Sequence, residues 1–106
     1  MSESDSKVLL SGIKPSGRLH VGNYFGAIKQ FIDLQKDYDS YVFVANYHAM
    51  TSVQDAGALK QQTLEVAIDY LAVGLNPEQT TLYLQSDVPE VHELTWVFNC
   101  LTTVPY

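Results

Sequence analysis

The sequence predicts an α/β fold in which a parallel sheet forms in the order β-α-β-α-β-α. Three short apolar runs, at residues 8–10, 41–45 and 81–85, have the length and composition of strands. Stretches with apolar residues at helical spacing follow each of them. Strands that alternate with helices pair in parallel through right-handed crossovers, and three of them make roughly half of a doubly wound nucleotide-binding domain.

Composition limits the class of protein. The chain has 106 residues, of which 46% are apolar and 17% charged, so it can form one small domain with a core and is neither disordered nor membrane-spanning. The single cysteine, Cys100, excludes an internal disulfide and predicts a cytoplasmic protein. The net charge of −6 is poorly suited to a nucleic-acid backbone, so a basic surface for RNA would lie elsewhere. Residues 1–6 are polar and predict a disordered tail before a folded part at 7–106.

The most informative stretch follows the first strand. Gly12 and Gly17 bracket Lys14, Pro15 and Ser16, and the order Pro-Ser-Gly is typical of a turn. A helix is expected to begin at residue 21, just after this turn. The start of a helix presents unpaired N–H groups and the positive end of the macrodipole, so it suits an anion such as a phosphate.

His20 and Asn23 lie in the first turn of that helix and are the candidate catalytic residues. Each can donate a hydrogen bond to phosphate oxygens and stabilise the charge that grows as the α-phosphorus is attacked. Gly22 lets a flat adenine ring approach the backbone, and Gly26 inside the helix indicates another close approach. The alternative is that His20 is only a polar residue at a helix start.

The first helix is expected to bury an apolar stripe that extends to residue 34. The second strand leads into a loop at 46–52 that contains His48, where parallel sheets bind ligands. His48 could line a small-molecule pocket or be a buried structural histidine. The expected members of the first stripe are Val21, Tyr24, Phe25, Ile28, Phe31, Ile32 and Leu34.

The second helix is expected at 55–73, capped by Asp55 or Ser52 and ended by Gly74. Its predicted stripe is Leu59, Leu64, Ala67, Ile68, Leu71 and Leu75. The third helix is expected from residue 89, capped by Ser86 or Asp87, with Cys100 as a small core residue. Its predicted buried face is Val91, Leu94, Val97, Phe98 and Leu101. The histidines have no metal-ligand spacing, so no metal held by the protein is predicted.

These residues resemble a known family. Residues 11–27 are similar to the first signature of the class I aminoacyl-tRNA synthetases, in the form used by the tryptophanyl enzymes. The His-Ile-Gly-His signature of the family reads here as His20, Val21, Gly22 and Asn23. Residues 47–51, 70–77 and 84–89 match further stretches, so the resemblance runs from about residue 11 to residue 99.

The resemblance implies the first half of a Rossmann-like catalytic domain, from an enzyme that joins tryptophan to tRNA(Trp) in two steps. ATP with Mg²⁺ would be a substrate, L-tryptophan would attack it, and the full-length enzyme would be a cytoplasmic homodimer. The Lys-Met-Ser-Lys-Ser signature, the acidic residue for the indole N–H and the tRNA-binding domain are expected beyond Tyr106. The chain would then be an N-terminal fragment with a small fraction of the full activity, if any.

The resemblance also assigns roles to individual positions. His20 would face the phosphates of ATP. The expected ATP contacts are Lys14, Pro15, Ser16, Gly22 and Asn23. The residues expected to border the amino-acid pocket are Leu10, Gly12 and His48.

Three other interpretations remain open from the sequence. One is a tyrosyl enzyme of the archaeal and eukaryotic type, although Asn23 and the loop at 46–51 favour tryptophan. Another is a nucleotidyltransferase of the pantothenate-ligase type, which usually has histidine at position 23. The third is a non-catalytic nucleotide-sensing or partner-binding module, which the sequence after Tyr106 would distinguish.

Overall fold

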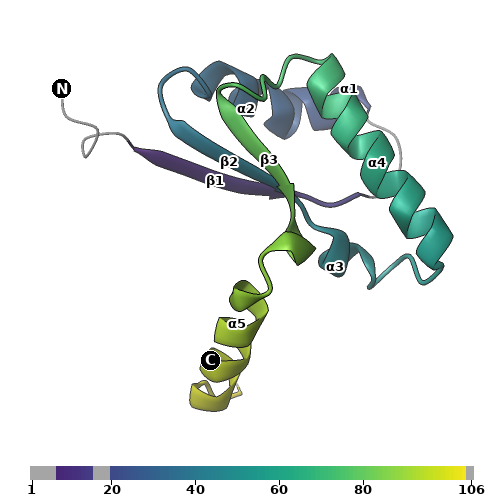
Figure 1. The fold of residues 1–106 in the computed structure, drawn as a ribbon, viewed down its shortest axis with the longest axis vertical. Coiled ribbons are helices and arrows are strands. Elements are labelled where there is room, and N and C mark those ends of the chain that lie inside the picture. The colour runs from purple at the N-terminus through teal and green to yellow at the C-terminus, as the bar shows by residue number, and fades with distance from the viewer. Residues whose placement is uncertain (1–6, 16–19, 105–106) are drawn as a thin grey trace.

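The computed structural model describes residues 7–15 and 20–104, and the predicted tail at 1–6 and the ATP contact assigned to Ser16 lie outside them. Its centre is a sheet of three parallel strands, β1 (Val8–Ile13), β2 (Asp39–Val44) and β3 (Thr80–Leu84), in the order β1-β2-β3 (Figure 1). Gly12 pairs with Phe43, and Phe43 pairs with Tyr83. The predicted α/β class, the alternation of strands and helices along the chain and the parallel pairing are confirmed.

Both crossover connections lie on one face of the sheet (Figure 1). The first contains α1 (Val21–Asn23), η2 (Tyr24–Ile28) and α2 (Lys29–Leu34), and the second contains α4 (Ala56–Ala72). Because two right-handed crossovers that step in the same direction must cover the same face, the order β1-β2-β3 requires this layering. The buried core lies between these helices and the sheet and consists of Ile28, Val42, Val44, Val66, Tyr70 and Leu75.

The segment η2 is a π-helix, which interrupts the expected α-helix. Of the predicted stripe, Ile28 is fully buried and Tyr24, Phe31 and Ile32 pack against the core. Val21 and Phe25 are exposed, so this part of the prediction is wrong. A π turn holds an extra residue, and the side chains before it are therefore rotated relative to an α-helical stripe.

The bounds of α4 agree with the sequence, but its predicted stripe is only partly right, because Leu75 is buried in the core and three other members are exposed. Asp55 caps the helix by accepting a hydrogen bond from the Ala58 N–H at 3.2 Å, and Gly74 follows its end with φ of 123°. The buried side chains of the helix are Val66 and Tyr70. Apolar residues occur on nearly all sides of α4, so their spacing did not identify the packed side. The exposed members of the predicted stripe are Leu64, Ile68 and Leu71.

A buried amide connects the two crossovers. The Gln35 Oε1 atom accepts hydrogen bonds from the Asn76 N–H at 2.9 Å and the Thr80 hydroxyl at 3.2 Å. Its Nε2 atom donates to the Gly74 carbonyl at 3.2 Å. Because Gln35 is buried and its amide is bonded on both sides, it fixes the end of α2 against the turn that leads into β3.

The last helix differs most from the prediction. The helix α5 (Glu90–Leu101) extends away from the sheet (Figure 1), and its expected buried face and Cys100 are all exposed. Neither predicted cap contacts its first turn: Pro89 precedes the helix without a side-chain hydrogen bond, and the Asp87 carboxylate accepts from the Leu84 N–H at 3.0 Å instead. The predicted burial is therefore wrong. An apolar stripe is buried only where a second layer packs on it, and the described residues supply none for α5.

Two short helices occur at the carboxyl ends of β2 and β3. The helix α3 (Asn46–Ala49) occupies the first part of the predicted loop at 46–52, and η3 (Gln85–Asp87) is a 3₁₀ turn after β3. Both are therefore located where a parallel sheet binds its ligands. None of the helices among the described residues combines the length and the apolar character needed to cross a membrane.

Candidate functional site

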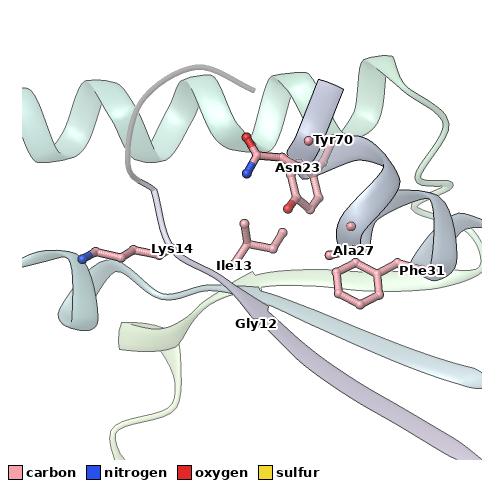
Figure 2. Close-up of a pocket in the computed structure, with 9 residues that line it drawn as sticks. Gly12, Ile13, Lys14, Asn23, Ala27, Phe31 and Tyr70 are labelled. Carbon is pink, nitrogen blue, oxygen red and sulfur yellow. The ribbon is translucent and has the colours of Figure 1, made fainter. Parts of the chain in front are cut away.

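Two pockets adjoin the carboxyl end of β1. The first, here called the helix-side pocket, lies under the start of the first crossover and has a volume of about 330 Å³ (Figure 2). The second, the open-face pocket, has a volume of about 400 Å³ and spans the ends of all three strands. Both volumes fall within the usual range for small-molecule sites. Gly12 and Lys14 line both pockets, so the pockets meet at the end of β1.

The helix-side pocket brings together several of the predicted ATP contacts. Lys14, Gly22 and Asn23 line it, and Pro15 lies fully buried next to Lys14 in the chain. Gly26 also lines it, and a Cβ atom added there would meet nothing within 4 Å. The space beside the unexpected helical glycine is therefore open, as a close approach of a ligand would require.

His20 and Asn23 bind each other in a reciprocal cap. The Asn23 N–H donates to His20 Nδ1 at 3.3 Å, and the His20 N–H donates to Asn23 Oδ1 at 3.1 Å. Because Nδ1 accepts a hydrogen bond, the N–H of a neutral His20 imidazole must be at Nε2. The cap likewise occupies the oxygen of the Asn23 amide and leaves its NH₂ group as a donor. The cap thus fixes both side chains at a helix start and leaves an N–H donor on each of them unused by the cap.

Gly22 supports this cap. A Cβ atom on Gly22 would lie 3.0 Å from His20 Cε1 and 3.1 Å from His20 Nδ1, so a side chain there would press on the imidazole. Glycine at this position therefore has a structural reason in addition to the adenine contact that the sequence suggested.

Tyr70 is a pocket residue that the sequence reasoning missed. It reaches the helix-side pocket from α4, and Figure 2 shows its hydroxyl directed toward Ile13. Burial raises the pKa of this hydroxyl above its ordinary value. It lies four residues after Val66 on the buried side of α4, a side that the helical spacing did not identify.

The open-face pocket contains two of the three residues expected near the amino acid, Gly12 and His48. Leu10 lies on the same face of the sheet but outside the described lining of this pocket. Phe43 was missed: a Cβ atom on Gly12 would lie 2.4 Å from its Cζ atom, so the ring covers the glycine. Ala45 and Gln85 complete the lining. The missed residues end or follow β2 and β3 and could have been found from that position alone.

The described residues contain no group of three or more His, Cys, Asp or Glu side chains that could hold a metal ion. None of the residues that line the helix-side pocket is acidic either. Magnesium prefers carboxylate, phosphate and water oxygens. The residues that line the helix-side pocket thus offer no carboxylate to such an ion.

Comparison with known proteins agrees with this geometry. The family model described as tRNA synthetases class I (W and Y) matches residues 2–105. The chain belongs to this family. The sequence is 57% identical over 95 residues to the tryptophan–tRNA ligase of Fusobacterium nucleatum, which covers 90% of the chain and 29% of the relative. It is 51% identical over 94 residues to that of Campylobacter jejuni, which covers 89% of the chain and 30% of the relative.

Solved structures give the same family and fold. The tryptophanyl-tRNA synthetase of Campylobacter jejuni complexed with ADP and tryptophan superposes with a TM-score of 0.85 at 50% identity, over 91% of this chain and 30% of that one. The Mycoplasma pneumoniae enzyme superposes with a TM-score of 0.86 at 37% identity, over 92% of this chain and 29% of that one. The chain thus spans about 30% of the length of such relatives.

Proposed function

We propose that this chain is the N-terminal part of the catalytic domain of a tryptophan–tRNA ligase. The observation that carries the proposal is the pair of pockets that meet at Gly12 and Lys14, beside the capped turn of His20 and Asn23. A site that joins an amino acid to a nucleotide needs two adjacent subsites with a common boundary. The relative from Campylobacter jejuni, which was solved with ADP and tryptophan, supports the same assignment.

In the proposed first step, a carboxylate oxygen of tryptophan attacks the α-phosphorus of ATP. A new P–O bond forms, the bond to the β-phosphate breaks with its electron pair, and pyrophosphate leaves. Mg²⁺ bound to the phosphates would neutralise part of their charge. The acyl group then passes from the adenylate to the terminal ribose of tRNA(Trp). This chemistry needs no covalent protein intermediate, so the chain contributes binding, orientation and charge stabilisation.

The nucleotide side of the site would be formed by the turn after β1. His20 Nε2–H and the Asn23 NH₂ group are the donors for the phosphates, because the reciprocal cap occupies the other atom of each side chain. Lys14 lines both pockets and would bring a positive charge to their boundary, where carboxylate and phosphate meet. Pro15, Ser16 and Gly22 would complete the ATP contacts.

The amino-acid side would be formed by the open-face pocket. Gly12 and His48 line it, and Leu10 would extend its apolar wall along β1. The full-length protein would act in the cytoplasm as a homodimer and bind tRNA(Trp) with residues outside this chain. The net charge of −6 supports that last point, because an acidic segment repels an RNA backbone.

The proposal can be tested by tryptophan-dependent pyrophosphate exchange with the full-length protein. We expect Asn23→Asp to lower kcat by about 10² or more, since it removes a donor aimed at the transition state. This variant keeps an oxygen to accept the His20 N–H, so the helix cap and the melting temperature should persist. An exposed amide, Gln61→Asp on α4, serves as the matched control.

Three results would contradict the proposal. One is exchange that depends on tyrosine rather than tryptophan. Another is full activity of a His20→Ala/Asn23→Ala protein. The third is exchange by the 106-residue chain alone at the rate of the full-length protein, because the second half of the site is expected to position the phosphates.

A further inference from the structure

The ends of β2 and β3 are joined by side-chain hydrogen bonds next to the open-face pocket. Asn46, the first residue of α3, donates through Nδ2 to the Ser86 hydroxyl at 2.8 Å. The Ser86 N–H returns a hydrogen bond to Asn46 Oδ1 at 3.2 Å. Both residues are partly buried, and both ends of the amide are used. Paired hydrogen bonds of this kind fix the orientation as well as the distance of two segments.

A second contact reaches the proposed pocket residue His48. The Gln85 Oε1 atom accepts a hydrogen bond from the His48 backbone N–H at 3.3 Å. This N–H belongs to the first turn of α3, where helices leave their N–H groups without backbone partners. Gln85 therefore supplies a missing acceptor, and it lines the open-face pocket together with His48.

The His48 carbonyl also accepts hydrogen bonds from the Thr51 N–H at 3.2 Å and the Thr51 hydroxyl at 2.9 Å, within the same short segment. His48 is exposed, and α3 is a single turn of four residues that would be unstable as an isolated helix. The contacts between α3 and η3 thus help to hold the turn from which His48 lines the pocket with Gly12 and Phe43.

We infer that Gln85 is a positioning residue for tryptophan binding, which acts by fixing His48, and that the Asn46–Ser86 pair fixes the same turn. This inference rests on the proposed function. Gln85 acts through its acceptor oxygen, which binds the backbone of α3. The inference requires no contact between its amide NH₂ group and the substrate. The affinity for the amino acid then depends on a contact between the short helices α3 and η3, whereas the affinity for ATP depends on the turn after β1.

The test is steady-state pyrophosphate exchange with the full-length protein that carries this sequence. Gln85→Leu removes the acceptor and should raise the KM for tryptophan by up to about tenfold, with the KM for ATP changed less than about twofold. Gln85→Glu keeps an acceptor at the same place, so its KM for tryptophan should lie nearer to the wild-type value. Gln61→Leu, an exposed amide on α4, should change neither constant.

A double-variant cycle separates positioning from direct contact. If Gln85 acts through the imidazole of His48, then Gln85→Leu should add less than about twofold to the KM of a His48→Ala protein, because coupled residues are not additive. Fully additive effects would overturn the inference, since they would show that Gln85 touches the substrate itself. An equal rise in both KM values, or a Gln85→Glu protein as weak as Gln85→Leu, would overturn it too.

The outcome can be distinguished from failure of the proposed function. If the wild-type protein shows no tryptophan-dependent exchange, the proposed function fails. If exchange is present and Gln85→Leu leaves the KM for tryptophan unchanged, only the inference on Gln85 fails. Asn46→Leu perturbs the same turn through a different contact, because it removes both hydrogen bonds to Ser86. This variant should also raise the KM for tryptophan.

Discussion

The two faces of the sheet differ sharply, although the same strands form both. On the covered face, Val42 is completely buried under the two crossovers. On the open face, Leu10 is 62% exposed, and Tyr41, Phe43 and Tyr83 lie along the neighbouring strands. The difference comes from topology, because two successive right-handed crossovers in one direction place all their helices on one side.

The open face is nevertheless apolar. Phe43 and Tyr83 pack together with their ring centroids 5.8 Å apart, and α5 exposes further apolar side chains, among them Trp96. A strand that ordinarily faces water alternates apolar and polar residues, whereas strands covered on both sides do not. The composition of β1 and β2 therefore fits a sheet with two covered faces, of which the described residues cover one.

The largest expected effect is a loss of stability on the covered face. Ile28→Ala should lower the free energy of unfolding of the 106-residue chain by about 2–5 kcal/mol, because it leaves a cavity under η2. Leu10→Ala should cost less than about 1 kcal/mol in the same chain, since this side chain is already exposed. Urea denaturation measures both, and equal losses would contradict the difference between the faces. A larger Leu10→Ala effect in the full-length protein would show that the open face is covered there.

A smaller effect is expected at the end of β1. Gly12→Ala should destabilise by about 1 kcal/mol and narrow the open-face pocket, because the Phe43 ring must move away. Gly26→Ala, on the covered side, meets no atom within 4 Å and gains up to about 1 kcal/mol of helix propensity. Thermal unfolding compares the two variants. The Gly12→Ala cost should disappear in a Phe43→Ala background, and its persistence there would refute the steric explanation.

The smallest change in stability at neutral pH is expected from substitutions of two tyrosines, whose effects differ only at alkaline pH. Burial raises the pKa of Tyr70 on the covered side above 10.0, so the folded state holds this proton more tightly than the unfolded state. The resulting stability is complete below the unfolded pKa and is lost as the pH rises above it, by up to about 1.4 kcal/mol per pH unit. Tyr70→Phe should therefore flatten the fall in stability above about pH 10.

Tyr41 is the control on the open face. The Asp39 carboxylate, through its charge and a hydrogen bond at 3.2 Å, also raises the pKa of Tyr41. Because both groups are exposed to water and salt, Tyr41→Phe should leave the alkaline stability profile nearly unchanged. An equal effect of the two substitutions on urea midpoints above about pH 10 would contradict the assignment to burial.

Much of the fold could be predicted because its signals are local. The strands, the cap at Asp55 and the stop at Gly74 depend on neighbouring residues, and each occurs within a few positions of its predicted place. The packed side of α4 and the exposure of α5 could not be predicted. Helical spacing identifies apolar sides, but which side is covered depends on layers that distant parts of a chain supply.

The candidate site divides in the same way. His20, Asn23 and Lys14 could be found because the turn, the glycines and the helix start adjoin in sequence. Gln85 and Phe43 had only their place at the ends of β3 and β2 as a signal, and strand pairing brings them together over long separations. Tyr70 could not be found, since the packing of α4 brings it to the helix-side pocket. The reciprocal cap of His20 and Asn23 was also missed, because two potential phosphate donors can equally well bind each other's backbone.

The π-helix at Tyr24–Ile28 has a consequence for how this segment tolerates change in length. A π turn contains one residue more than the α-helical turn it replaces. Deleting a single residue there would restore regular winding and swing the imidazole and amide by about 100° around the helix axis relative to Ile28. The direction in which these two groups point therefore depends on the number of residues between the cap and Ile28. Homologues that bind the same nucleotide in the same way should conserve this spacing more strictly than the identity of the residues within it.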